Sequence, residues 1–148
     1  MIPKIAKVTV SAIVHATEDP DKIISAMHGI GSEAEGRLER RRASGHYGNE
    51  IQTLRLLISN RSRTENFLNH LWGRLSLVDR TEMIDNLSGY LDESGRLHIR
   101  IDKQEAVNGA IVLRQTEPIR IEISFDLQGI PHKSLTTLIA KRLEQLAS

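Results

Sequence analysis

Apolar and polar residues alternate near the start of the chain. Over residues 6–16, one set of alternating positions is small and apolar, and the set between them is mainly polar. The apolar set is Ala6, Val8, Val10, Ala12 and Val14, and the polar set is Lys7, Thr9, Ser11 and His15. A period of two residues predicts a strand with one buried face.

A helix is expected directly after this strand. Thr17 or Asp19 can cap its first turn, and Pro20 is tolerated there because the first helical N–H groups need no intrahelical partner. Apolar residues then recur at helical spacing, and two glycines follow that end the helix. These residues are Ile23, Met27 and Ile30, with Gly29 and Gly31.

The middle of the chain is typical of an antiparallel hairpin. Residues 33–42 alternate weakly, and Leu54, Leu56 and Ile58 alternate again with polar residues between them. The segment 44–49, Ser-Gly-His-Tyr-Gly-Asn, lies between the two and has the composition of a turn.

Two helices, three strands and a final helix are predicted for the second half. Ser62 with Glu65, and Ser76 with Asp79, are spaced as helix starts, and each is followed by an apolar stripe. Residues 97–101, 110–114 and 119–125 are predicted strands, and residues 130–148 are expected to hold a last amphipathic helix. The predicted order is β-α-β-β-α-α-β-β-β-α. Strands with one polar face indicate an α+β fold, an antiparallel or mixed sheet with helices packed on one face, in a single domain over residues 1–148.

Composition narrows the possible functions. The chain has 148 residues, of which 39% are hydrophobic and 26% are charged, so it can bury a core. Lys and Arg number 20 against 19 Asp and Glu, which excludes a polybasic binder and requires any nucleic-acid affinity to come from local clustering. The absence of cysteine excludes disulfide scaffolds and thiolate metal sites. No apolar run is long enough to cross a bilayer, and the start is not typical of a signal peptide, so we expect a soluble, cytoplasmic protein.

The clearest candidate site is an arginine-rich strand that leads into the glycine turn. Residues 37–42, Arg-Leu-Glu-Arg-Arg-Arg, carry four arginines against one glutamate. Guanidinium groups fit phosphate oxygens, and backbone N–H groups of a glycine loop can do the same. The alternative is a solvated hairpin whose arginines pair with nearby carboxylates. Because successive strand residues face opposite ways, a register shift of one residue would move Arg40 and Arg42 together to the opposite face from the one expected to meet RNA.

A second candidate lies where Asp102 ends a strand. Lys103 and Gln104 could contact a phosphate and a sugar hydroxyl. The alternative is that Asp102 caps a short helical turn in which Lys103 is solvated, and the sequence favours this alternative.

The sequence gives little support for a metal site or for an enzyme active site. His15, His46 and His98 lack the close spacing of metal ligands, and His15 and His98 are expected on polar strand faces. Ser44 and His46 lack the context of a nucleophile, and no glycine-rich phosphate loop follows a strand. We therefore expect no enzyme, no cofactor and no metal.

Several motifs together resemble a known family. They are residues 16–19 (Ala-Thr-Glu-Asp), 45–49 (Gly-His-Tyr-Gly-Asn), 97–104 (Leu-His-Ile-Arg-Ile-Asp-Lys-Gln) and 118–125 (Pro-Ile-Arg-Ile-Glu-Ile-Ser-Phe). Their order and spacing resemble the archaeal family of predicted RNA-binding exosome subunits, over about residues 7–125. The family often has a second histidine where Tyr47 stands and a proline where Glu50 stands. The resemblance implies RNA binding and a fold similar to the ribosomal protein that holds five-S RNA.

The prediction is a non-enzymatic RNA-binding protein, an accessory factor in archaeal RNA processing associated with the exosome. Since only five aromatic residues occur, duplex or structured RNA is the expected partner, recognised by phosphates and shape. A protein adaptor without RNA contact is the alternative, and a homo-oligomer is compatible with either. The candidate RNA contacts are Arg37, Arg40, Arg41, Arg42, Gly45, His46, Tyr47, Gly48, Asn49, Arg100, Lys103 and Gln104.

Overall fold

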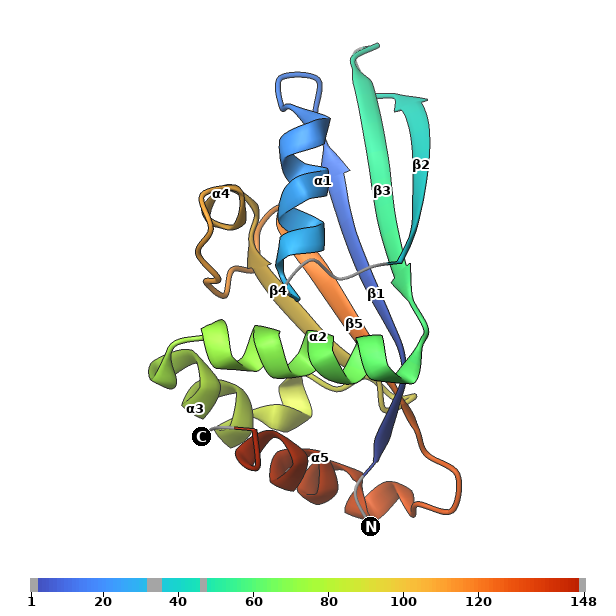
Figure 1. The fold of residues 1–148 in the computed structure, drawn as a ribbon, viewed down its shortest axis with the longest axis vertical. Coiled ribbons are helices and arrows are strands. Elements are labelled where there is room, and N and C mark those ends of the chain that lie inside the picture. The colour runs from blue at the N-terminus through green and yellow to red at the C-terminus, as the bar shows by residue number, and fades with distance from the viewer. Residues whose placement is uncertain (1–2, 32–35, 46–47, 147–148) are drawn as a thin grey trace.

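The computed structural model describes residues 3–31, 36–45 and 48–146, which form five strands with helices between and after them (Figure 1). The first half contains β1 (Lys4–Val14), α1 (Pro20–Gly29), β2 (Arg37–Ser44), β3 (Glu50–Ile58) and α2 (Arg61–Arg74). The second half contains α3 (Leu77–Asp85), β4 (Leu97–Asp102), α4 (Lys103–Val107), β5 (Pro118–Asp126) and α5 (Leu135–Glu144). Short 3-10 turns at Leu87–Gly89 and His132–Ser134 complete the described elements.

The strands form one sheet in the order β2-β3-β1-β5-β4, and every neighbouring pair is antiparallel. Strands β2 and β4 are therefore the two edges, with β1 in the centre. This confirms the predicted α+β class and makes the sheet antiparallel rather than mixed. The β2–β3 hairpin projects beyond the helices at one end of the molecule (Figure 1).

The helices cover one face of the sheet, as predicted, and the core lies between them and that face (Figure 1). Alternate strand residues such as Val10, Leu56 and Ile121 are almost completely buried, whereas most of their neighbours on the other face are partly or fully exposed; Thr9, 8% exposed, is an exception. Helix α2 contributes the largest buried side chains, Phe67 and Trp72. In the described part of the chain no helix packs on the other face, which carries Ser11, Arg55, Arg100 and Arg120 and which we call the open face (Figure 1).

Polar side chains cap the helices where the chain leaves a strand or loop. Asp19, Ser76 and Asp102 each accept a hydrogen bond from a backbone N–H of the following turn, as predicted. The predicted capping box of Ser62 and Glu65 is wrong. Asn60 caps α2 instead and accepts from the N–H of Arg63, so the helix begins one residue before Ser62.

Two predicted strands differ from the observed ones. In β1 the pairing with β5 shifts between Ile5 and Lys7, and this bulge leaves Ala6 exposed while Ile5 is buried. The alternation of apolar and polar residues predicted that Ala6 is buried. This prediction is wrong because the sequence pattern does not reveal a bulge. Residues 110–114 make a single bridge, between Leu113 and Ile101, and form no strand.

The final helix belongs to the core. It is shorter than predicted, Leu135–Glu144, and buries Leu135, Ile139 and Leu143. It therefore closes the hydrophobic core. Within the part of the chain that the structure describes, no helix is long and apolar enough to cross a membrane.

Candidate nucleic-acid interface

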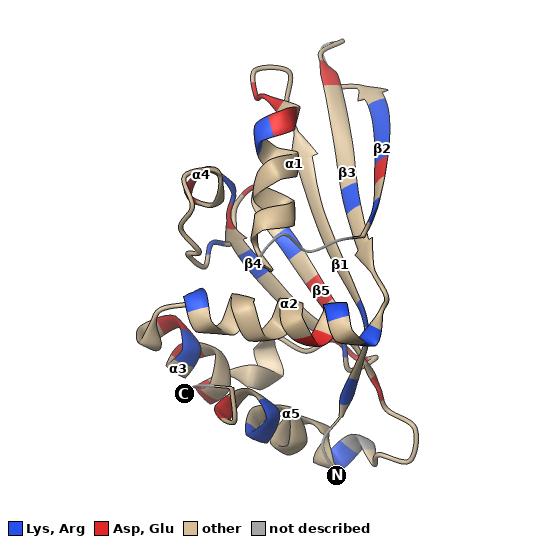
Figure 2. Ribbon diagram, in the orientation of Figure 1, with Lys and Arg blue, Asp and Glu red and all other residues tan. Residues whose placement is uncertain are grey.

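A row of residues crosses the open face from one edge of the sheet to the other. Strand register pairs Glu39 with Arg55, Arg55 with Ser11, Ser11 with Arg120 and Arg120 with Arg100. Paired residues of neighbouring strands point to the same face, so these side chains line one path across all five strands. Figure 2 shows basic positions along β3, β4 and β5, and both acidic and basic positions on β2, whose member of this row is Glu39.

Arg100 and Arg120 stand directly opposite each other on β4 and β5. Directly opposed like charges on neighbouring strands destabilise a sheet. Neither guanidinium has an ion pair or a side-chain hydrogen bond with any residue in the described part of the chain, and Arg120 is exposed. The two side chains therefore form a site of positive charge with free hydrogen-bond donors.

The neighbouring basic residues of this face are partly neutralised. Arg55 lies 3.4 Å from Glu39, Arg96 lies 3.4 Å from Glu122, and Arg114 lies 3.2 Å from Asp102. Exposed pairs of this kind contribute little to stability, about 0–1 kcal/mol each, and can exchange partners. Arg100 and Arg120 thus keep their positive charges unpaired among the described residues, whereas these neighbours do not.

The arginines of β2 do not form one patch. The register places Arg41 and Arg37 on the open face, and Arg40 and Arg42 on the face that carries the helices. Arg40 donates a 2.8 Å hydrogen bond to Gln52, and Arg42 lies 3.4 Å from Glu50. Arg37 lies 3.7 Å from Glu39. Within the described residues, Arg41 has no such partner.

Two backbone hydrogen bonds join the described residues of the turn between β2 and β3. The N–H of Gly45 donates to the carbonyl oxygen of Asn49, and the N–H of Gly48 donates to the carbonyl oxygen of Gly45. Gly48 has φ +77°, a conformation that favours glycine. His46 and Tyr47, also predicted as contacts, lie outside the described residues. The hairpin belongs to one edge of the sheet and Arg100 to the other, so an RNA that touched both would have to span the sheet.

Lys103 and Gln104 both bind Glu18, Lys103 in a buried position and Gln104 at the surface. The side chain of Lys103 is only 5% exposed, and its Nζ donates to the carbonyl oxygen of Ile13 and to Oε1 of Glu18, both at 2.8 Å. Gln104 Nε2 donates to Oε2 of Glu18 at 2.9 Å. The expectation that Lys103 is solvated is therefore wrong, although Asp102 caps the turn as predicted. The aliphatic stem of lysine and the proximity of Glu18, distant in sequence, make this burial possible.

The same contacts act on the Glu18 carboxylate. Burial by itself raises the pKa of Glu18, but the hydrogen bonds from Lys103 and from the His15 N–H, together with the charges of both residues, outweigh it and lower the pKa. Glu18 therefore stays ionised and holds the buried ammonium. The three side chains join α4, β1 and the turn before α1 into one rigid corner.

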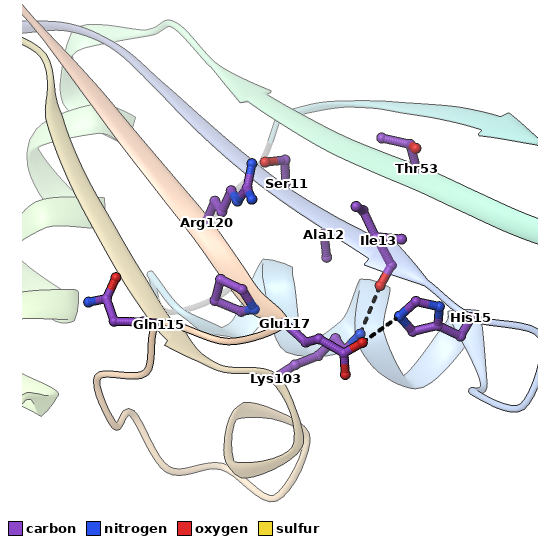
Figure 3. Close-up of a pocket in the computed structure, with 10 residues that line it drawn as sticks. Ser11, Ala12, Ile13, His15, Thr53, Lys103, Gln115, Glu117 and Arg120 are labelled. Atoms are coloured by element: carbon purple, nitrogen blue, oxygen red, sulfur yellow. Dashed lines mark hydrogen bonds and ion pairs between the residues drawn. The ribbon is translucent and has the colours of Figure 1, made fainter. Parts of the chain in front are cut away.

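A hollow of about 370 Å³ opens on the open face next to this corner (Figure 3). Its sides come from β1, β3, β5 and the segment before β5. The lining residues include Ser11, Ile13, His15, Thr53, Gln115, Glu117, Pro118 and Arg120. At the rim, His15 Nε2 lies 3.0 Å from Oε1 of Glu117.

The histidines of the polar strand faces pair with carboxylates. Besides His15 with Glu117, His98 Nε2 lies 2.8 Å from Oδ2 of Asp92, and this hydrogen bond is the main cause of the lowered pKa of Asp92. Among the residues that the structure describes, no group of three or more His, Cys, Asp or Glu side chains is arranged to hold a metal ion.

Sequence reasoning missed Arg120 as a site residue. Its position between Ile119 and Ile121 already predicted a polar face, but the sequence does not say which strand lies beside β5. Only the register of β4 against β5 places Arg120 opposite Arg100. Ser11 and Thr53 were missed for the same reason.

Comparisons with known proteins agree on one family. The model of a family described as RNA binding matches residues 7–125. The chain is 28% identical over 139 residues to the RNA-binding protein PAB1135 of Pyrococcus abyssi, covering 91% of this chain and 90% of that protein. A crystal structure of protein AF2318 from Archaeoglobus fulgidus is 30% identical with a TM-score of 0.76, covering 97% of this chain and 100% of that one. Protein Mth689 from Methanothermobacter thermautotrophicus is 26% identical with a TM-score of 0.74, covering 97% and 98%. Because the family model spans most of the chain, this protein belongs to the RNA-binding family that the model describes.

Proposed function

We propose that this protein is a non-enzymatic factor that binds structured RNA, with arginines of the open face holding backbone phosphates. The observation that carries the proposal is the opposed pair of Arg100 and Arg120, which has no carboxylate partner in the described part of the chain. A guanidinium presents a planar fork of donors that fits phosphate oxygens. A bound phosphate would relieve the repulsion between the two arginines.

Phosphate and shape recognition suits this surface better than base stacking. The large aromatic side chains Phe67, Trp72 and Phe125 are buried. Proteins that bind single strands usually stack successive bases on exposed aromatics. A broad sheet face with arginines is instead suited to the backbone of a duplex or a folded RNA.

The β2–β3 hairpin is proposed to extend this contact. Arg41 shares the open face with Arg100 and Arg120. The turn at residues 45–49 remains a predicted contact, although the N–H groups of Gly45 and Gly48 already donate within it. Arg40 and Arg42 would reach RNA only if it also wrapped around the hairpin edge. Lys103 and Gln104 remain predicted RNA contacts. Their hydrogen bonds to Glu18 also hold together the corner of the fold beside this surface.

A role in RNA processing, in association with the exosome, is also proposed, and the resemblance to predicted exosome subunits supports it. The rival function is a protein adaptor without RNA contact. The formal charge of +1 and the exposed apolar side chains of Leu77 and Val78, 70% and 77% exposed on α3, favour this rival. A partner that stays bound to the purified protein after nuclease treatment, through α3, would support the adaptor.

The deciding experiment is fluorescence anisotropy with matched duplex and single-stranded RNA over a salt series. We expect tighter binding to the duplex and a steep loss of affinity with salt. Arg100→Gln and Arg120→Gln should each weaken binding about tenfold, the effect of losing one charge-assisted hydrogen bond. Each should also reduce the salt slope by about one.

Arg61→Gln is the matched control, because it removes one exposed arginine from α2, on the covered side of the sheet. This variant should bind like the wild type. Equal losses in all three variants would indicate a general charge effect rather than a site. No binding at low salt would contradict the proposal and favour the adaptor.

A further inference from the structure

The hollow beside Arg120 differs in shape and chemistry from the rest of the open face. It is concave, holds about 370 Å³, and carries an apolar wall as well as polar groups (Figure 3). Small-molecule sites combine these features, and this volume lies near the lower end of their usual range, about 300–1,000 Å³. We propose that the hollow takes one unpaired nucleotide of the bound RNA, with its base against Ile13 and Pro118 and its phosphate on Arg120. This rests on the proposed function, because it names the feature of the RNA that the same face would select.

The apolar wall is unusual for its surroundings. Ile13 is 48% exposed on a strand face whose neighbouring positions carry Ser11, Thr53 and Arg55, and Pro118 lies beside it in the hollow. An exposed isoleucine next to a proline ring offers a flat apolar surface to the face of a base. A base within a duplex is stacked on its neighbours and cannot reach this surface, so the base must come from a bulge, loop or end.

Polar groups stand around this wall without partners. The hydroxyls of Ser11 and Thr53 and the amide of Gln115 make no side-chain hydrogen bond with any described residue. Hydroxyls and amides both donate and accept, so they can meet the edge of a base. Arg120 lines the same hollow with its guanidinium directed toward Ser11 (Figure 3), and its strand position lies opposite Arg100, where the phosphate backbone is proposed to run.

One residue that lines the hollow, Glu117, has a strained backbone conformation. Glu117 has φ +46°, the left-handed region, and it precedes a proline, which disfavours helical conformations at the preceding residue. Strained residues of this kind persist where surrounding contacts fix them, and they concentrate at binding sites. The side chain of Glu117 lies 3.0 Å from His15, which also lines the hollow. The strained residue is therefore part of the wall of the hollow.

The test compares three RNA duplexes of equal length: fully paired, with a single-nucleotide bulge, and with an abasic bulge. The abasic bulge bends the backbone like the nucleotide bulge but offers no base. We expect the wild type to bind the nucleotide bulge about tenfold more tightly than the other two, the effect of one stacked base. Equal binding of the abasic and the nucleotide bulge would overturn the inference, because deformability alone would then explain the preference.

Two substitutions localise the effect. Ile13→Thr removes most of the apolar wall but keeps a neutral, β-branched strand residue. The ratio of the affinities for the nucleotide bulge and the abasic bulge should then fall close to one. Val112→Thr also places a threonine at an exposed β-branched apolar position, but at a residue that is 42% exposed and does not line the hollow, and it should keep the preference. The readout is the ratio of one variant's affinities for two RNAs. A general loss of stability or charge lowers both affinities alike and therefore leaves this ratio unchanged.

Failure of this inference can be told from failure of the proposed function. Duplex binding with no preference for the bulge would overturn the nucleotide pocket and leave phosphate recognition intact. An unchanged preference in Ile13→Thr would place the selective contact elsewhere and also overturn the pocket. No binding of any of the three RNAs would overturn both.

Discussion

The ammonium of Lys103 lies 2.8 Å from Oε1 of Glu18, in a corner where the lysine side chain is 5% and the glutamate side chain 14% exposed. The two residues are 85 positions apart in the sequence. They join the end of β4 to the turn between β1 and α1. Lys103 also lines the hollow of the open face. The corner thus supports the surface that we propose for RNA.

Breaking this pair should destabilise the protein. Glu18→Gln leaves a nearly buried ammonium without its counter-charge, which costs about 3 kcal/mol of unfolding free energy. Replacing both residues, with Lys103→Met added, should restore part of the loss. Urea unfolding of the wild type, both single variants and the double variant measures the coupling. Strictly additive effects would contradict a direct interaction.

Acid should weaken the protein through Asp92. The hydrogen bond from His98 lowers the pKa of Asp92 below its ordinary value of about 3.9. A carboxylate with a lowered folded pKa stabilises the fold fully above that ordinary value, and this stabilisation disappears as the pH falls through the folded pKa.

Asp92→Asn should therefore be less stable than the wild type at pH 6, and the difference should shrink toward pH 2. Urea unfolding at both pH values measures it. Lys103 and the His15 N–H lower the pKa of Glu18, so its contribution to the stability of the fold should also be lost as the pH falls. A difference between Asp92→Asn and the wild type that stays constant over this range would show that the charge of Asp92 contributes nothing.

The two faces of β2 should contribute unequally to RNA binding. Arg41→Gln should weaken binding about tenfold because Arg41 lies on the open face without a partner among the described residues. Arg40→Gln should have little effect, because Arg40 faces the other way and donates to Gln52. Anisotropy with duplex RNA compares the two. Equal losses would show that the hairpin contacts RNA with both faces.

Backbone strain at Glu117 predicts a reversal of the usual preference for alanine over glycine. Both Glu117→Ala and Glu117→Gly remove the carboxylate, but only glycine adopts φ +46° without steric cost. The glycine variant should be more stable than the alanine variant by about 1 kcal/mol. Thermal unfolding of the two variants tests this. An alanine variant of equal or greater stability would contradict strain at this position.

Local patterns were enough to predict most of the elements. Alternation predicted β4 and β5, because their buried isoleucines and leucine occur at every second position. Caps such as Ser76 and Asp102 were predicted because their hydrogen bonds join residues only three apart. The bulge at Ala6 and the single bridge at Leu113 were not predicted, since each depends on a partner strand that the local sequence does not specify.

From the sequence alone one can predict the α+β class, the order of nearly all elements, the polar and apolar faces of the strands and, by resemblance, an RNA-binding family. Which charges meet depends on how distant segments pack. Strand register brings Arg120 opposite Arg100 and separates Arg41 from Arg40, and chain packing buries Lys103 against Glu18. Periodicity arises from contacts between near neighbours in the chain, whereas a charged surface arises from contacts between distant segments. For this reason the composition, with its net charge of +1, does not indicate the unpaired arginines of the open face.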